Sequence, residues 1–199
     1  MSTLIYQIDF FDYWHAGTGL VSGANSDASV QKDKEDRPFI PGKTLKGLLR
    51  EAAETLQILG NEKITDNFIK EVFGERNLDN EETSGTKRLE KEAKSFFSNA
   101  TLSANLQEKI KKKNAKFLYQ QIASTAIEKN GQAKDYSLRS VEVTVPLVLY
   151  ASIHNFDRNH QEAMNDCLKW IKRMGLNRNR GLGRCQFKFH SFIDKNQNT

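Results

Sequence analysis

The sequence predicts an α+β fold, because short strand-like segments alternate with amphipathic helical stretches along a chain of 199 residues. The order of these segments is β, α, β, β, α, β. This order is typical of two helices packed on one face of an antiparallel sheet. The chain is long enough for one domain with a substantial core. It shows no internal repeat and no linker rich in proline or glycine that would divide it.

The first part of the pattern is a strand followed, after a long irregular segment, by helices. Residues 4–10 are short, apolar and β-branched, as expected for a strand. Residues 11–38 hold several glycines and then a charged stretch, and a loop of this length inside a compact domain is usually functional or mobile. Leucines and alanines at helical spacing predict a helix over residues 44–59, with Gly60 as its C-cap. Residues 64–73 predict a shorter second helical stretch.

The middle of the chain contains the strongest strand signal. Residues 95–102 predict a strand, whereas residues 103–140 are charged and weakly patterned. Residues 140–153 are rich in valine and other strand-forming side chains. Pro146 lies within this run, and proline cannot donate to a strand ladder. We therefore expect two pieces there, or an edge or bulge.

A helix and a strand complete the pattern. Asn159 is expected to cap a helix whose apolar residues recur at helical spacing over residues 163–171. Residues 184–192 alternate polar and apolar side chains, as a half-buried strand does. The whole order predicts a ferredoxin-like, or RRM-like, βαββαβ arrangement. One long insertion follows the first strand, and another lies around the second and third strands.

Charge and composition exclude several classes of protein. The net charge is +5, a weak indication of a polyanionic partner. The excess is local, because eight cations and two acids stand between Arg158 and Lys188. The two cysteines, Cys167 and Cys185, make neither a disulfide framework nor a zinc site. No apolar run approaches the roughly 20 residues that span a bilayer, and the start of the chain does not resemble a signal peptide. We therefore expect a cytoplasmic protein without a membrane partner.

Two basic segments that contain glycine stand at opposite ends of the chain. In the first, residues 39–50, Lys43 lies at the predicted helix N-terminus, where the helix dipole attracts anions. Lys46 and Arg50 continue along the same helix face. This pattern predicts a phosphate-binding face, and the alternative is the solvated side of an amphipathic helix.

The second basic segment, residues 174–184, places Arg178, Arg180 and Arg184 among glycines. Glycine exposes backbone N–H groups that bind phosphate oxygens, and arginines pair with phosphate through two hydrogen bonds. An ordinary turn with arginines in solvent is the alternative. Because three cations are more than a turn requires, this segment predicts a phosphate-binding loop.

Two residues of the long loop are candidates for chemistry. His15 could act as a general base or stack on a nucleotide, and a lone histidine also serves structural roles. Asp27 lies in a stretch rich in glycine, asparagine and serine, where aspartate commonly forms an Asx-turn. It could instead act at a scissile phosphate, directly or through a divalent metal. Asp33, Glu35 and Asp36 follow and have the pattern of a solvated charge run.

The order of these motifs resembles one family. The chain is similar to the RAMP (repeat-associated mysterious protein) superfamily of CRISPR systems, above all to the backbone subunits of type III effector complexes. The resemblance covers most of the chain. The Ile-Pro-Gly-Lys-Thr-Leu-Lys-Gly run and the terminal glycine loop are specific as a pair. The matching segments, in the family's order, are residues 14–19, 27–33, 40–50, 96–100 and 175–184.

The resemblance implies a single RAMP domain over residues 1–199, with insertions at about 11–38 and 75–140. The core would be a ferredoxin-like palm and the second insertion a thumb. Copies of such subunits assemble along a CRISPR RNA and present it to complementary RNA, so base pairing supplies the specificity. The implied partners are CRISPR RNA, target RNA and other effector subunits, including copies of this chain or related RAMP subunits. Residues 122–133 resemble the stretch that faces the duplex.

The resemblance also implies an activity. In target-cleaving type III subunits, an aspartate in the loop after the first strand cuts target RNA with a divalent cation such as Mg²⁺. By position this aspartate falls on Asp27, which would be both the catalytic residue and the metal ligand. We therefore expect a metal-dependent endoribonuclease in antiviral defence. The residues expected to hold RNA are His15, Lys43, Lys46, Arg50, Arg178, Arg180 and Arg184, with the two basic segments as two sides of one groove.

Three alternatives stay open at this point. The chain could be a non-catalytic RNA-binding scaffold with the same surface. It could be a metal-independent endoribonuclease that processes CRISPR RNA, with His15 as general acid or base. It could also be a RAMP-like protein outside guide-RNA complexes.

Overall fold

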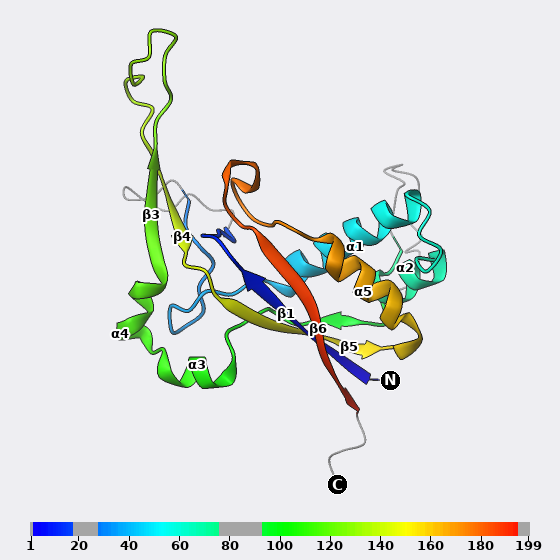
Figure 1. Cartoon of the computed structure of the whole chain (residues 1–199). Coiled ribbons are helices and arrows are strands. Elements are labelled where there is room, and N and C mark those ends of the chain that lie inside the picture. Colours follow the sequence, from blue (N-terminus) through cyan, green and yellow to red (C-terminus); the bar gives the residue numbers. More distant parts are fainter. Residues whose placement is uncertain (1, 18–27, 76–92, 195–199) are drawn as a thin grey trace, which may run out of the picture.

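The computed structural model describes residues 2–17, 28–75 and 93–194. Its centre is a four-stranded sheet in the order β2-β5-β1-β6, in which every neighbouring pair is antiparallel (Figure 1). The strands are β1 (Ser2–Phe10), β2 (Phe96–Phe97), β5 (Val148–Phe156) and β6 (Cys185–Asp194). The mixed α+β class with antiparallel pairing is therefore confirmed.

Three helices accompany the sheet: α1 (Gly42–Ile58), α2 (Asp66–Phe73) and α5 (Gln161–Trp170). Alternate side chains of β1 are fully buried, namely Leu4, Tyr6 and Ile8, as the period of two in a strand requires. They form one core with the apolar stripes of the helices. Within the described residues, no helix is long and apolar enough to cross a membrane.

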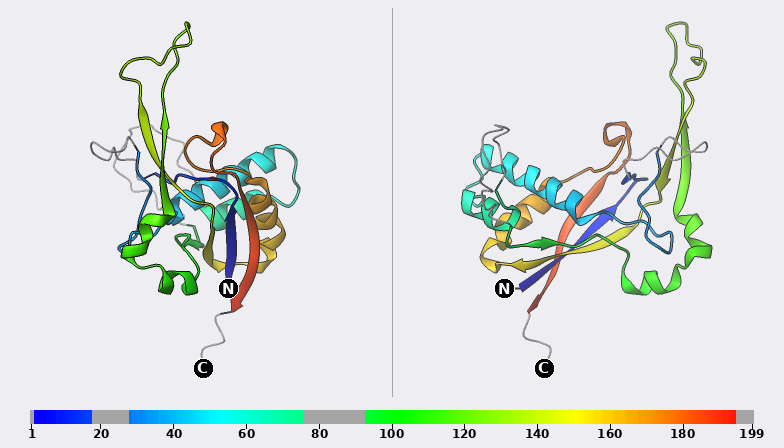
Figure 2. Two further views of the ribbon diagram at one scale, coloured as in Figure 1. Left: turned by 60° about the vertical axis from the view of Figure 1, so that its left-hand side comes forward. Right: turned by 180° about the vertical axis from the view of Figure 1, so that it is seen from behind.

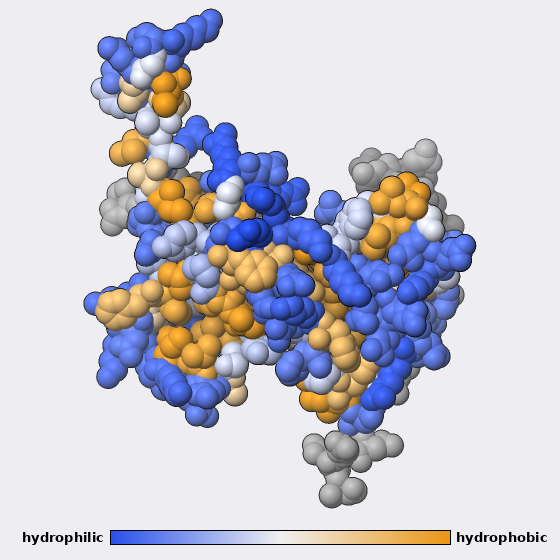
Figure 3. Space-filling model, viewed as in Figure 1, coloured by the Kyte–Doolittle hydropathy of each residue, from blue (hydrophilic) through white to orange (hydrophobic). Residues whose placement is uncertain are grey.

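A second, two-stranded sheet projects away from the first. It consists of β3 (Tyr119–Ser124) and β4 (Arg139–Thr144), an antiparallel hairpin with a long tip (Figure 2). The short helices α3 (Ala104–Lys109) and α4 (Lys112–Ala115) lie at its base. Figure 3 shows apolar groups among hydrophilic ones along this projection. They agree with the exposed apolar side chains that the hairpin tip carries, which are Ile127, Tyr136 and Leu138.

Several element boundaries differ from those that the sequence predicts. The strand expected over residues 95–102 is the two-residue β2, extended only by isolated bridges at Ala100 and Thr101. The helix cap expected at Asn159 is wrong. A 3-10 turn precedes α5, and the carboxylate of Asp157 accepts a hydrogen bond of 3.0 Å from the backbone N–H of Asn159. Asp157 therefore caps the 3-10 turn, and within the described residues no side chain caps α5 itself.

The break at Pro146 is confirmed and has a larger consequence than a bulge. The chain leaves the projecting hairpin at Thr144 and enters the central sheet at Val148. One continuous strand-forming run thus supplies strands to two different sheets. The proline sits between them, where its missing N–H leaves no ladder position empty.

Candidate nucleic-acid interface

The segment that follows β1 joins the basic loop over residues 174–184 to the β3–β4 hairpin. The backbone N–H of Gly183 donates to the carbonyl of Tyr13 at 2.8 Å, and that of Leu176 donates to the carbonyl of His15 at 3.1 Å. On its other side, Trp14 and Thr144 exchange backbone hydrogen bonds of 3.1 and 2.8 Å. This segment therefore ties the basic loop over residues 174–184 to the base of the β3–β4 hairpin.

His15 is buried at the centre of this junction. His15 is only 3% exposed, and its Nδ1 donates to the carbonyl of Glu142 at 2.7 Å. Its Nε2 faces Gly17, where a β-carbon would lie 2.7 Å away. In this structure the imidazole therefore holds two segments together, and contact between His15 and RNA stays a prediction.

Two glycines of the basic loop are required by close packing. A β-carbon at Gly175 would overlap the carbonyl oxygen of His15, and one at Gly183 would overlap that of Met174. Both residues also have positive φ, at 92° and 70°, which side chains rarely adopt. Gly175 lets the loop lie against the segment after β1, and Gly183 lets the two ends of the loop lie against each other. The role that the sequence suggested for them, backbone exposure to phosphate, is not needed to explain them.

The arginines of this loop project from that fixed base. Arg178 and Arg180 lie in a 3-10 turn and are exposed, as is Arg184 directly before β6. Arg184 Nε forms an ion pair of 3.2 Å with Asp12. The loop and the hairpin rise on the same side of the central sheet in every view (Figures 1 and 2). Exposed guanidinium groups on an anchored loop can bind phosphate oxygens through paired hydrogen bonds.

The first basic segment begins α1 as predicted. The N–H of Gly42 donates to the side-chain oxygen of Asn99 at 2.9 Å, so part of the helix N-terminus is already occupied. A β-carbon at Gly42 would overlap the carbonyl of Phe97, which explains the glycine. Lys43 follows and is exposed, so its ammonium group is available to an anion.

Lys46 and Arg50 lie together on one flank of α1. Arg50 Nε donates to Glu54 at 2.8 Å, and both side chains are less than one third exposed. Partial burial, followed by the nearby charge of Arg50, holds the pKa of the Lys46 ammonium below its usual range. Arg50 is thus partly neutralised within the helix, whereas Lys46 is a cation in a positive environment.

Two cations of α1 and Arg178 of the basic loop lie on different flanks of this helix. Successive helix residues are about 100° apart, which places Lys46 and Arg50 on one side of the buried stripe and Glu51 and Thr55 on the other. Glu51 and Thr55 line a cavity of about 150 Å³ with Arg178. The structure therefore does not bring Lys46 and Arg50 into one groove with Arg178, as the sequence had suggested.

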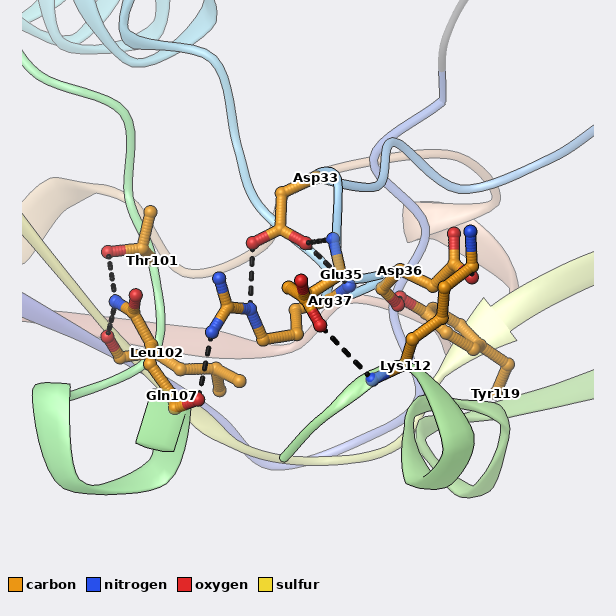
Figure 4. Close-up of polar contacts among 9 residues, drawn as sticks. All are labelled: Asp33, Glu35, Asp36, Arg37, Thr101, Leu102, Gln107, Lys112 and Tyr119. Atoms are coloured by element: carbon orange, nitrogen blue, oxygen red, sulfur yellow. Dashed lines mark hydrogen bonds and ion pairs between the residues drawn. The ribbon is translucent and has the colours of Figure 1, made fainter. Parts of the chain in front are cut away.

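The charged stretch at the end of the long loop is ordered by hydrogen bonds and is not simply solvated. The carboxylate of Asp33 accepts hydrogen bonds from the backbone N–H groups of Glu35 and Arg37 and from Arg37 Nε (Figure 4). Arg37 also donates to the carbonyl of Gln107 at 2.9 Å, and Tyr119 donates to the carbonyl of Asp36 at 2.6 Å. This network attaches the stretch to α3 and to the start of β3.

Glu142 is a contributor that the sequence pattern did not reveal. Its carboxylate, 14% exposed, accepts from Lys32 Nζ at 2.7 Å and from the backbone N–H of Val30 at 3.1 Å. Lys32 also lies 4.0 Å from the centre of the Tyr119 ring. A lone glutamate in an alternating strand carries no signal for such a role. It fixes the described end of the long loop onto β4.

Asp27, the predicted catalytic residue, lies outside the described residues. Within the described part of the chain, Glu71, Asp157 and His160 form the group of possible metal ligands whose ligand atoms lie within 4.8 Å of one another. This group lines a cavity with Ser2 and Asp194, at the start of β1 and the end of β6. It is therefore at the opposite end of the sheet from the long loop.

Comparison with known proteins identifies the family. The model of the RAMP superfamily matches residues 8–186. A chain in the cryo-EM structure of the type III-B Cmr-beta complex bound to cognate target RNA is similar, with a TM-score of 0.65 and 12% identity over 94% of this chain and 96% of that one. A chain of the apo complex gives a TM-score of 0.64 with the same identity and coverage. A search of curated proteins gave no match. The family match spans the junction and both basic segments, and this chain belongs to the RAMP superfamily.

Proposed function

We propose that this chain is an RNA-binding backbone subunit of a type III CRISPR effector complex. The observation that carries the proposal is the loop of exposed arginines, anchored through Gly175 and Gly183 to the segment after β1 in a chain of the RAMP superfamily. Such a loop binds a phosphate backbone without reading sequence. CRISPR RNA, target RNA and other effector subunits are the partners proposed for it.

The proposal includes a division of the chain into palm and thumb. The strand order β2-β5-β1-β6, with α1 and α5 in the two crossover connections, supports a ferredoxin-like palm. The β3–β4 hairpin with α3 and α4 corresponds to the thumb-like insertion. Its attachment to the palm through His15, Glu142 and Trp14 would fix the angle at which it meets the RNA.

The proposed reaction is cleavage of target RNA at Asp27 with a divalent cation, Mg²⁺ or a similar ion. Such a cation stabilises charge at a scissile phosphate. The group of possible ligands in the described structure lies at the other end of the sheet, so the cation enters this proposal through Asp27 alone. Lys43, Lys46 and the arginines Arg178, Arg180 and Arg184 would hold the guide RNA.

Purification of the natural complex tests the proposal. We expect an RNA with a repeat-derived 5′ tag and other CRISPR subunits to accompany the chain. With complementary RNA and Mg²⁺, the complex should cut, and a complex with Asp27→Ala should bind the target without cutting it. Unchanged cleavage by this variant would remove Asp27 from the mechanism.

Two further outcomes would replace the proposed reaction. A target RNA that stays intact with Mg²⁺ in the wild-type complex would indicate a scaffold subunit. Cleavage of precursor RNA in EDTA, lost in His15→Ala, would indicate a processing endonuclease. The burial of His15 and its bond to Glu142 favour a structural role for this side chain over that alternative.

A further inference from the structure

An exposed aromatic ring lies in a basic pocket beside the basic loop over residues 174–184, called the arginine loop below. Phe11, the residue that follows β1, is 47% exposed. It lines a pocket of about 530 Å³ with Lys172, Arg173 and Arg184, and Cys185 and Gln186 complete the walls. A single exposed phenylalanine is ordinary on a protein surface. Three cations around one exposed ring are a more specific arrangement, because they combine a flat apolar surface with positive charge.

The backbone around this ring is held by hydrogen bonds from three segments. The N–H of Phe11 donates to the carbonyl of Arg184 at 3.0 Å, and the N–H of Cys185 donates to the carbonyl of Lys172 at 2.9 Å. Arg173 and Arg184 form a further antiparallel bridge. The ring and the cations therefore start from a backbone that is already ordered, which lowers the entropy lost on binding.

The pocket keeps a net positive charge, although one of its three cations pairs with a carboxylate. Arg184 pairs with Asp12 and its guanidinium carbon lies 5.7 Å from the centre of the Phe11 ring. Arg173 donates to the carbonyl of Arg178, a neutral acceptor. Lys172 adds a third, exposed cation. One carboxylate thus faces three cations, which suits an anionic ligand.

We infer that this pocket binds one nucleotide of single-stranded RNA, with its base stacked on Phe11 and its phosphate held by Lys172 and Arg173. Stacking on aromatic rings within a basic groove is the usual chemistry of sequence-independent single-strand binding. Arg173 directly precedes the arginine loop and Arg184 ends it, so RNA that crosses the loop reaches this pocket. The inference rests on the proposed RNA-binding function and adds a stacking position to it.

Single substitutions in the full chain test the stacking position. The probe is a fluorescein-labelled single-stranded RNA, with binding followed by anisotropy. Phe11→Ala should weaken binding about 5- to 100-fold, the loss associated with one base–aromatic stack. Phe11→Trp should retain binding. Phe96→Ala is the matched control, since Phe96 is 65% exposed on β2, at the opposite edge of the sheet.

The salt dependence of binding separates stacking from charge. Phe11→Ala should leave the slope of log affinity against log salt unchanged, whereas Arg173→Gln should reduce it by about 0.7, the value for one phosphate contact to a single strand. An acidic peptide would need the cations but not the ring, so it should bind Phe11→Ala and the wild type equally.

The outcomes distinguish failure of the inference from failure of the function. If the wild type binds RNA and Phe11→Ala binds as tightly as Phe96→Ala, the stacking position is wrong and RNA binding by the arginine loop stands. If the wild type binds no RNA, either alone or in its complex, the proposed function is wrong and the inference falls with it. Because Phe11 is half exposed, its truncation should leave the unfolding transition close to that of the wild type.

Discussion

Replacement of Gly175 by alanine should destabilise the protein through two separable effects. The first is conformational, because φ is 92° and a side chain in the left-handed region costs about 1–2 kcal/mol. The second is steric, since the new β-carbon would overlap the carbonyl oxygen of His15. Relief of that overlap must lengthen the 3.1 Å bond from Leu176 to the same oxygen, which costs about 1 kcal/mol or more. We expect a total loss of about 2–4 kcal/mol.

Gly181 offers a matched control in the same loop. Its φ is 89°, and a β-carbon there would meet no atom within 4 Å. Gly181→Ala should therefore show only the conformational cost, about 1–2 kcal/mol. The difference between the two variants isolates the contact with His15. Denaturant unfolding followed by tryptophan fluorescence suits the measurement, because Trp14 is fully buried next to His15.

Equal destabilisation by the two substitutions would contradict the contact between Gly175 and His15. It would mean that the basic loop does not pack closely on the segment after β1, and that the anchoring on which the proposed RNA surface depends is absent. In thermal unfolding, the expected difference corresponds to about 2–8 °C for a chain of this size. Gly47→Ala, in the exposed part of α1 where a β-carbon meets nothing within 4 Å, should instead raise stability slightly.

Three further outcomes are expected. Glu142→Ala should lower the free energy of unfolding by about 1.5–3 kcal/mol in denaturant unfolding, because it leaves the Lys32 ammonium without its carboxylate. Glu142→Gln keeps an acceptor for the N–H of Val30 and should cost less. Equal losses in the two variants would contradict this account. Burial raises the pKa of Asp33, but the hydrogen bonds and charge of Arg37 outweigh it and hold the pKa below its usual range. A carboxylate whose pKa is lower in the folded state stabilises the protein fully above its unfolded-state pKa, and this stabilisation is lost as the pH falls through its folded-state pKa. The wild type should therefore exceed Asp33→Asn in unfolding free energy at neutral pH, and the difference between the two proteins should narrow below about pH 4. A difference that does not change with pH would exclude this linkage. Replacing both loop arginines at positions 178 and 180 by glutamine should lower the salt slope of RNA binding by about 1.4, and an unchanged slope would show that they do not contact phosphate.

Local pattern predicted the elements that face one core. β1, α1 and β6 were expected within a few residues of their bounds, because each presents an apolar face at its own period to the same interior. Of the β3–β4 hairpin, β4 falls within the strand-forming run predicted over residues 140–153, whereas β3 was not expected. Both of its faces are partly exposed, so β3 has no alternation of buried and exposed residues to detect. A strand without a buried face leaves no period in the sequence.

The polar contacts of the charged stretch at the end of the long loop could not be predicted from local pattern either. Asp33 and Asp36 belong to a run of charged residues that is typical of a solvated surface. In the fold, Arg37 links Asp33 to the carbonyl of Gln107, and Tyr119 donates to the carbonyl of Asp36. Those partners are 70 and 83 residues away along the chain from the residues they contact. No local spacing encodes a contact of that range.

The α+β core, the family and the two basic segments with glycine can be read from residue type and local period alone. How those two segments are placed in space depends on the fold. It placed Arg178 and Lys46 on different flanks of α1, and it packed Gly175 and Gly183 against backbone rather than leaving them open to phosphate. The physical reason is that a glycine permits both uses equally, and the choice depends on which chain segment lies within contact distance.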